Sequence, residues 1–171
     1  MKKITILAAT IALVSIAGTT FAQQTSSATA SASATVITPI SISKTVDMNF
    51  GNVAVGSSLG TVVLATAGTR TSTGGVSLPA TTGSPTAASF TVTGQGNYTY
   101  AITLPSTALT ITDGASHNMT VTTFTSNPGS TGTLSSGTQT LLVGATLNVG
   151  ASQATGAYTS ATPFTVTVNY N

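Results

Sequence analysis

The nine residues Pro163–Asn171, P-F-T-V-T-V-N-Y-N, decide the fold. Side chains of an extended chain alternate between two faces, so one face of this segment carries only Phe164, Val166, Val168 and Tyr170. The other face carries threonine and asparagine. A strand with one apolar face needs neighbouring strands beside it and a second layer against that face. The segment therefore predicts a layered β-protein.

Earlier stretches repeat the period of two. Ala88–Val92 and Tyr98–Leu104 alternate on either side of Gly94–Asn97, which predicts a β-hairpin. Within residues 141–149, Leu141, Val143, Leu147 and Val149 keep odd-numbered spacing. Phe124 shifts the parity of its segment, which predicts a bulge.

Three further segments complete the expected architecture. Val36–Ile42 predicts an edge strand, because Pro39 has no N–H to donate to a ladder. Gly56–Ser58 predicts a turn, and Gly68–Gly75 predicts a polar loop that holds Arg70. We therefore predict an all-β fold, an antiparallel immunoglobulin-like or pilin-like β-sandwich of about eight to ten strands. It forms a single domain over residues 35–171.

The N-terminus has the pattern of an export signal. Lys2 and Lys3 precede an apolar run, Ile4–Ala17, and a small-residue exit, Gly18–Ala22. This pattern predicts a signal peptide over residues 1–22. The alternative, a retained membrane anchor, is short for the hydrocarbon core of a bilayer. Residues 23–34 are rich in Ser, Thr and Ala without visible periodicity, which predicts a flexible tail. The expected location is the periplasm, the cell surface or the exterior of a bacterium.

Removal of the leader makes the chain electrically neutral. The full chain has a net charge of +2, and the part after residue 22 holds Lys44 and Arg70 against Asp47 and Asp113. Neutrality favours association between copies, and it argues against a nucleic-acid partner, which needs clustered cations. No later stretch is long and apolar enough to span a membrane, and the chain has no cysteine.

Few residues are suited to catalysis. The chain has one His, two Asp and no Glu or Cys. Asp113 and His117 lie close together, and we interpret them as a turn and a solvated strand end. Zinc and calcium sites need ligand clusters that are missing here. We therefore predict no enzyme activity, no cofactor and no metal.

Several stretches together resemble a known family. They are Ile40–Ile42 before Met48–Val53, Gly60–Leu64, Phe90–Gly94 with Tyr98–Pro105, and Gly144–Tyr170. In this order they resemble the bacterial secreted family called domain of unknown function 4402, over roughly residues 35–171. The resemblance implies a secreted or surface β-sandwich and assigns no activity. A weaker likeness is to spore-coat-U-type and archaic chaperone–usher pilins, which commonly carry a cysteine pair that is absent here.

Two functional hypotheses remain open. The first is a pilin-like or fimbria-like structural subunit that forms a homopolymer through strand edges, with a periplasmic chaperone as a further partner. Its candidate pairing faces are Val36, Ile40, Ile42, Val166, Val168 and Tyr170. The second is a monomeric adhesin that binds a surface through the loop around Arg70.

Overall fold

The predicted all-β sandwich is confirmed. The structure is a computed structural model that describes residues 24–171, so the predicted signal peptide at 1–22 lies outside the described residues. The contact pattern divides the chain into two units, with the boundary between Thr35 and Val36. In the first unit, residues 24–35 form no helix or strand and are exposed along their whole length. The second unit contains every strand of the described chain.

Eleven strands form the domain, against the eight to ten expected. In chain order they are β1 (Ser41–Val46), β2 (Ala54–Leu64), β3 (Arg70–Ser77), β4 (Ala88–Thr93), β5 (Thr99–Thr103), β6 (Leu109–Thr112), β7 (Asn118–Asn127), β8 (Thr131–Thr133), β9 (Thr138–Val149), β10 (Thr159–Ser160) and β11 (Thr167–Tyr170). All their pairings are antiparallel.

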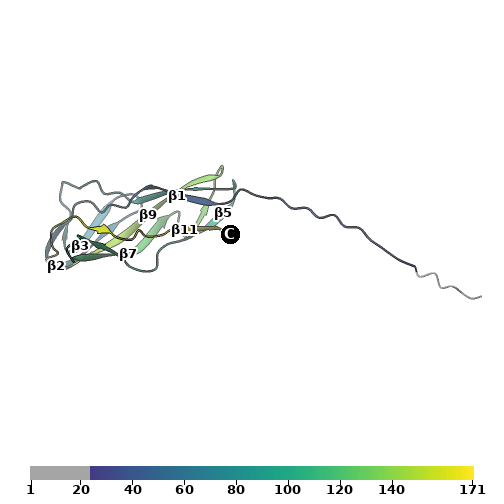
Figure 1. Cartoon of the computed structure of the whole chain (residues 1–171). Helices are drawn as coiled ribbons and strands as arrows, with labels where there is room; N and C mark the ends of the chain where they lie inside the picture. The colour runs from purple at the N-terminus through teal and green to yellow at the C-terminus, as the bar shows by residue number, and fades with distance from the viewer. Residues whose placement is uncertain (1–23) are drawn as a thin grey trace, which may run out of the picture. The chain divides into compact units, whose positions relative to one another are not determined.

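The larger sheet has eight strands arranged around β9. One edge of β9 pairs with β7. The other edge pairs first with β4, over Thr138–Val143, and then with β2, over Ala145–Val149. Gly144 lies between these two pairings, and a Cβ there would overlap the carbonyl oxygen of Leu64. The missing side chain therefore lets the end of β2 approach β9 closely. In Figure 1, β9 runs through the domain, with β2, β3 and β7 toward one end and β5 with the C-terminus toward the other.

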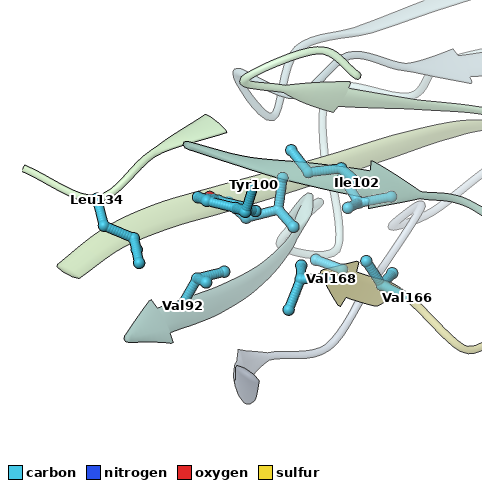
Figure 2. Close-up of a cluster of buried hydrophobic side chains, with 9 residues drawn as sticks. Val92, Tyr100, Ile102, Leu134, Val166 and Val168 are labelled. Carbon is cyan, nitrogen blue, oxygen red and sulfur yellow. The ribbon is translucent and has the colours of Figure 1, made fainter. Parts of the chain in front are cut away.

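The smaller sheet has only three strands, in the order β11-β5-β8. It covers one of two apolar clusters in the domain. Figure 2 shows Tyr100 and Ile102 of β5 facing Val92 of β4, with Val166 and Val168 beside them. We call this cluster the first core; its buried members are Ala88, Val92, Tyr100, Ile102, Leu134, Leu141, Val143, Val166 and Val168. The burial of Val166 and Val168 confirms the apolar face predicted for the C-terminal segment.

The second core lies against the other half of the larger sheet. Its buried members are Val62, Val76, Val121, Ala145, Leu147 and Val149. Phe124 and Met48 are partly buried and pack against both cores. The odd-numbered spacing predicted for β9 is thus confirmed, because Leu141 and Val143 enter the first core and Leu147 and Val149 the second.

The predicted hairpin between Ala88–Val92 and Tyr98–Leu104 is wrong. Both segments are strands, but β4 belongs to the larger sheet and β5 to the smaller one. The residues between them carry the chain from one sheet to the other. The two strands turn apolar faces toward the same core from opposite sides. Each strand therefore alternates apolar and polar residues, as the two strands of a hairpin also do.

Three local predictions also need correction. The first strand begins at Ser41, after Pro39, and not at Val36. The predicted turn at Gly56–Ser58 is part of a bulge within β2, whose register with β3 shifts between Val55 and Gly60. The predicted loop at Gly68–Gly75 is mostly strand, since β3 begins at Arg70. Glycine and serine lower strand propensity, and the pairing with β2 overrides that preference here.

Two other predictions are confirmed. β1 is an edge strand, paired only with β4. The parity shift at Phe124 is a bulge, because the register between β7 and β9 shifts between Thr122 and Thr125. Thr123 has a φ of 49° at this point.

Candidate functional site

Five of the six predicted pairing residues lie together in the structure. Val166 and Val168 are buried in the first core, and Ile40, Ile42 and Tyr170 pack against it. The sixth, Val36, is 95% exposed. The five side chains are thus already packed within the domain. β1 and β11 each pair with a strand on one side only, and they contact each other at one margin of the sandwich, so unpaired main-chain groups lie along this margin.

Tyr170 holds the start of the domain in place. Its hydroxyl donates to the carbonyl oxygen of Thr38 at 2.7 Å and accepts from the Gln95 N–H at 2.6 Å. The Thr38 N–H in turn donates to the Gln95 side-chain oxygen at 3.2 Å. A Cβ at Gly94 would overlap the Tyr170 hydroxyl, so the glycine makes room for this contact. Both main-chain groups of Thr38 are therefore held at the end of β1 where the chain enters the domain.

Loss of the Tyr170 hydroxyl should loosen this entry point. We expect Tyr170→Phe to lower the free energy of unfolding by about 1–2 kcal/mol, because two hydrogen bonds disappear while the packed ring stays. Amide exchange should quicken at Gln95, whose N–H loses its acceptor. Exchange at Leu147 and Val149, at the opposite end of β9 from the Thr93–Thr138 pairing, should stay unchanged. Unchanged protection at Gln95 would contradict the role given to the hydroxyl.

A groove lies over the second core. Its volume is about 1030 Å³. Its floor is the inner face of β6, β7 and β9, with Leu109, Ile111, Met119, Val121, Leu147 and Val149. One wall is the segment from Lys44 to Val55, and the other runs from Gln153 to Phe164. Apart from the ends of β1 and β2, one isolated bridge and the two-residue β10, these walls are irregular backbone.

Several polar groups of the groove walls form hydrogen bonds or ion pairs within the domain. The Tyr158 hydroxyl donates to the carbonyl oxygen of Ala154 at 2.8 Å and accepts from the Gln153 side-chain amide at 2.9 Å. Lys44 and Asp47 form an exposed ion pair with nitrogen-to-oxygen distances of 2.7 and 2.9 Å. No buried side-chain polar atom of the described chain lacks a hydrogen-bond partner. The groove floor is thus apolar, and Gln153, Tyr158, Lys44 and Asp47 of its walls are bonded to other groups of the domain.

Arg70 is committed to the domain's own backbone. One guanidinium nitrogen donates to the carbonyl oxygens of Phe50 and Asn52, at 2.6 and 2.8 Å. Gly51 lies between these residues with a φ of 69°, which turns both carbonyls toward the guanidinium. Arg70 therefore anchors one wall of the groove to β3.

Removal of the guanidinium should destabilise that wall. We expect Arg70→Ala to lower the free energy of unfolding by about 2 kcal/mol, because the partly buried Phe50 carbonyl and the exposed Asn52 carbonyl both lose a charged donor. Arg70→Lys should recover only part of the loss, since one ammonium lacks the planar fork of the guanidinium. Urea unfolding of the three proteins tests this. Equal stability of wild type and Arg70→Ala would contradict the structural role.

The single histidine lies at the tip of the β6–β7 hairpin. Asp113 Oδ1 accepts from the N–H groups of Ala115 and His117, at 2.8 and 3.2 Å, and its Oδ2 lies 2.6 Å from His117 Nδ1. An ionised carboxylate only accepts, so Nδ1 carries the proton. The hydrogen bond from the His117 ring is the largest cause that lowers the pKa of Asp113, with the two N–H donors adding to it and desolvation opposing it. The pair closes a turn.

A comparison with known protein families shows to which family the chain belongs. Residues 40–170 match the family model described as "Domain of unknown function (DUF4402)". The chain belongs to the DUF4402 family. The match spans the whole sandwich from Ile40 to Tyr170, which confirms the resemblance seen in the sequence. No curated protein and no solved structure gives a significant match to it.

The described part of this DUF4402 chain brings no metal-binding cluster together. Among residues 24–171, no three His, Cys, Asp or Glu side chains gather at one point. Nor does that part hold a helix with the length and hydropathy of a membrane span. The groove was not predicted from the sequence, because its floor comes from three strands and its walls from segments without alternation.

The Asp113 turn gives this DUF4402 domain a testable pH response. A carboxyl whose pKa is lower in the folded state stabilises that state above its ordinary pKa of 3.8, and the contribution is lost as the pH falls through the folded value. We expect the melting temperature to fall below about pH 4, and to fall less steeply in Asp113→Asn. Identical profiles for both proteins would contradict the assignment.

Proposed function

We propose that this chain is a non-enzymatic structural protein, exported to the bacterial cell surface, that self-associates through strand edges in the manner of a fimbrial subunit. The supporting observation is the incomplete pairing at the margin where β1 and β11 meet. Each strand leaves one row of main-chain donors and acceptors without a strand partner in the described chain. An extended segment of another copy can add to such an edge by main-chain hydrogen bonds.

The charge distribution supports the same proposal. After residue 22 the charges balance, and two of the four sit in the Lys44–Asp47 ion pair. Long-range repulsion between copies is therefore weak. The groups that an enzyme would use have structural partners here, since Asp113 closes a turn with His117 and Arg70 binds two backbone carbonyls. A periplasmic chaperone that covers the open edges before assembly fits this picture.

Electron microscopy of sheared surface material tests the proposal. Cells that export the full chain should carry filaments, and cells that export a variant without residues 24–35 should lose them. The deletion stops at Thr35 because Ile40 and Ile42 pack against the first core, and their loss would unfold the domain. Filaments that survive the deletion would remove the tail from the mechanism. A monomer that binds glycan and forms no filament would favour the adhesin alternative.

A further inference from the structure

The tip of the β6–β7 hairpin carries the one Asp–Gly pair of the chain, Asp113–Gly114. No Asn–Gly pair occurs, and the other aspartate, Asp47, is followed by Met48. Among pairs that begin with aspartate, Asp–Gly rearranges most readily, because glycine has no Cβ to obstruct closure of a ring. The hairpin tip is therefore the place where isomerisation of this chain is chemically easiest.

The reaction needs no group from outside the chain except water. The main-chain nitrogen of Gly114 attacks Cγ of the neutral Asp113 carboxyl group, and a C–N bond forms. The carboxyl hydroxyl leaves as water, together with the proton of the amide. Water then opens the resulting succinimide ring at either carbonyl carbon. One opening restores aspartate, and the other gives isoaspartate, in which the main chain runs through the former side chain.

The hydrogen bonds of the Asp113 carboxylate oppose this attack. Oδ1 accepts from the N–H groups of Ala115 and His117, at 2.8 and 3.2 Å, and Oδ2 lies 2.6 Å from His117 Nδ1. Both oxygens therefore bind donors that lie beyond Gly114 in the chain. Hydrogen bonds to a carboxylate favour its ionised form, whereas the neutral acid is the form whose hydroxyl can leave as water.

The attacking nitrogen is also held in place. The Gly114 N–H donates to Thr112 Oγ1 at 3.2 Å, and the φ of Gly114 is 81°. The Asp113 N–H donates to the carbonyl oxygen of His117 at 3.3 Å, next to the pairing of Thr112 with Asn118. The peptide unit between Asp113 and Gly114 is thus fixed from both sides, so the turn must open before the nitrogen can reach Cγ.

We infer that His117 protects the Asp113–Gly114 pair from isomerisation, by binding the Asp113 carboxylate through its ring and its main-chain N–H. His117 makes two of the three hydrogen bonds that this carboxylate accepts. The chain's single histidine thereby has a chemical role that is not catalytic. Isoaspartate would lengthen the main chain at the tip of a hairpin whose strand β6 supplies Leu109 and Ile111 to the groove floor. The inference goes beyond the proposed function, because it applies to a monomer as well as to a filament.

Prolonged incubation of the purified exported protein tests the inference. The folded protein and the same protein unfolded in urea are kept at neutral pH. Isoaspartate at position 113 is measured at intervals, by chromatography and mass spectrometry of a proteolytic peptide. The folded protein should accumulate it more slowly by about tenfold or more, because the reaction follows the population of the opened turn. Asp47, which precedes Met48, is the internal reference and should change little in either state.

Three variants separate the role of the His117 ring from that of general stability. His117→Ala should speed isomerisation in the folded protein by about twofold to fivefold, the range for loss of an ion pair at the surface. His117→Gln should restore part of the protection, because its side-chain amide can donate to the carboxylate. Tyr170→Phe is the matched control. It removes hydrogen bonds to Thr38 and Gln95 and leaves the turn intact, so it should isomerise at the rate of the wild type.

Three results would overturn the inference. The first is an equal rate in the folded and the urea-unfolded wild type, which would remove any protection by the turn. The second is a His117→Ala protein with the circular dichroism of the folded state that isomerises no faster than the wild type. The third is an equal acceleration in Tyr170→Phe, which would assign the effect to general stability. None of these measurements depends on filaments, so failure of this inference and failure of the proposed function are seen separately.

Discussion

Tyr100→Ala is expected to lower the free energy of unfolding by about 4 kcal/mol, which is the range for deletion of a buried aromatic ring. Tyr100 has no exposed surface and lies in the middle of the first core, between the two sheets (Figure 2). A single domain of this kind has a total stability of only about 5–15 kcal/mol, so the loss is a large share of it. Urea unfolding followed by far-ultraviolet circular dichroism measures the change.

Tyr100→Phe is the matched control. It keeps the ring and removes only the hydroxyl, which donates to the Gln139 side-chain oxygen at 2.8 Å. That oxygen also accepts from the Thr133 N–H at 2.8 Å, so it keeps a partner in the variant. Burial raises the pKa of the Tyr100 hydroxyl, so the group is a neutral donor. We expect a loss of about 1 kcal/mol. Equal losses for the two variants would contradict a ring-filled core between the sheets.

Gly144→Ala should be the second most damaging change, with an expected loss of about 3 kcal/mol. The new Cβ meets the Leu64 carbonyl oxygen and the backbone of Ala65 and Thr66, none of which can rotate away as a side chain does. β2 must then withdraw from β9 where β4 and β2 share one edge of that strand. Thermal unfolding of the variant measures the loss.

Gly129→Ala is the control for the loss of a glycine as such. A Cβ at Gly129 meets no atom within 4 Å, so the substitution should change stability by no more than about 0.5 kcal/mol. If the two alanine substitutions, at positions 129 and 144, lowered the stability by similar amounts, the close approach of β2 to β9 would not be the reason for Gly144.

Local alternation predicted most of the strands correctly. Val166 and Val168 are buried as expected, and so are Leu141 and Val143 of β9. Alternation reports which face of a strand is apolar and says nothing about which strand lies beside it. For that reason it could not show that Phe90 and Tyr100 belong to different sheets.

The candidate site was harder to predict. The predicted pairing residues are apolar residues from the first and last segments of the sandwich. In the structure, apolar residues such as Ile42 and Val168 pack inside the domain. The groove floor contains Ile111, Met119 and Val149, which come from three different strands. These residues become neighbours only through the order of the strands in the sheet, and local alternation does not report that order.

The most direct test of the account is the native mass of the exported protein, measured by sedimentation over a wide concentration range, for the full chain and for the variant without residues 24–35. If copies assemble through the tail and the strand edges, the mass of the full chain rises with concentration in steps of one subunit, while the variant keeps the mass of a folded monomer. A full chain that remains monomeric throughout, or a variant that assembles as well as the full chain, would contradict it.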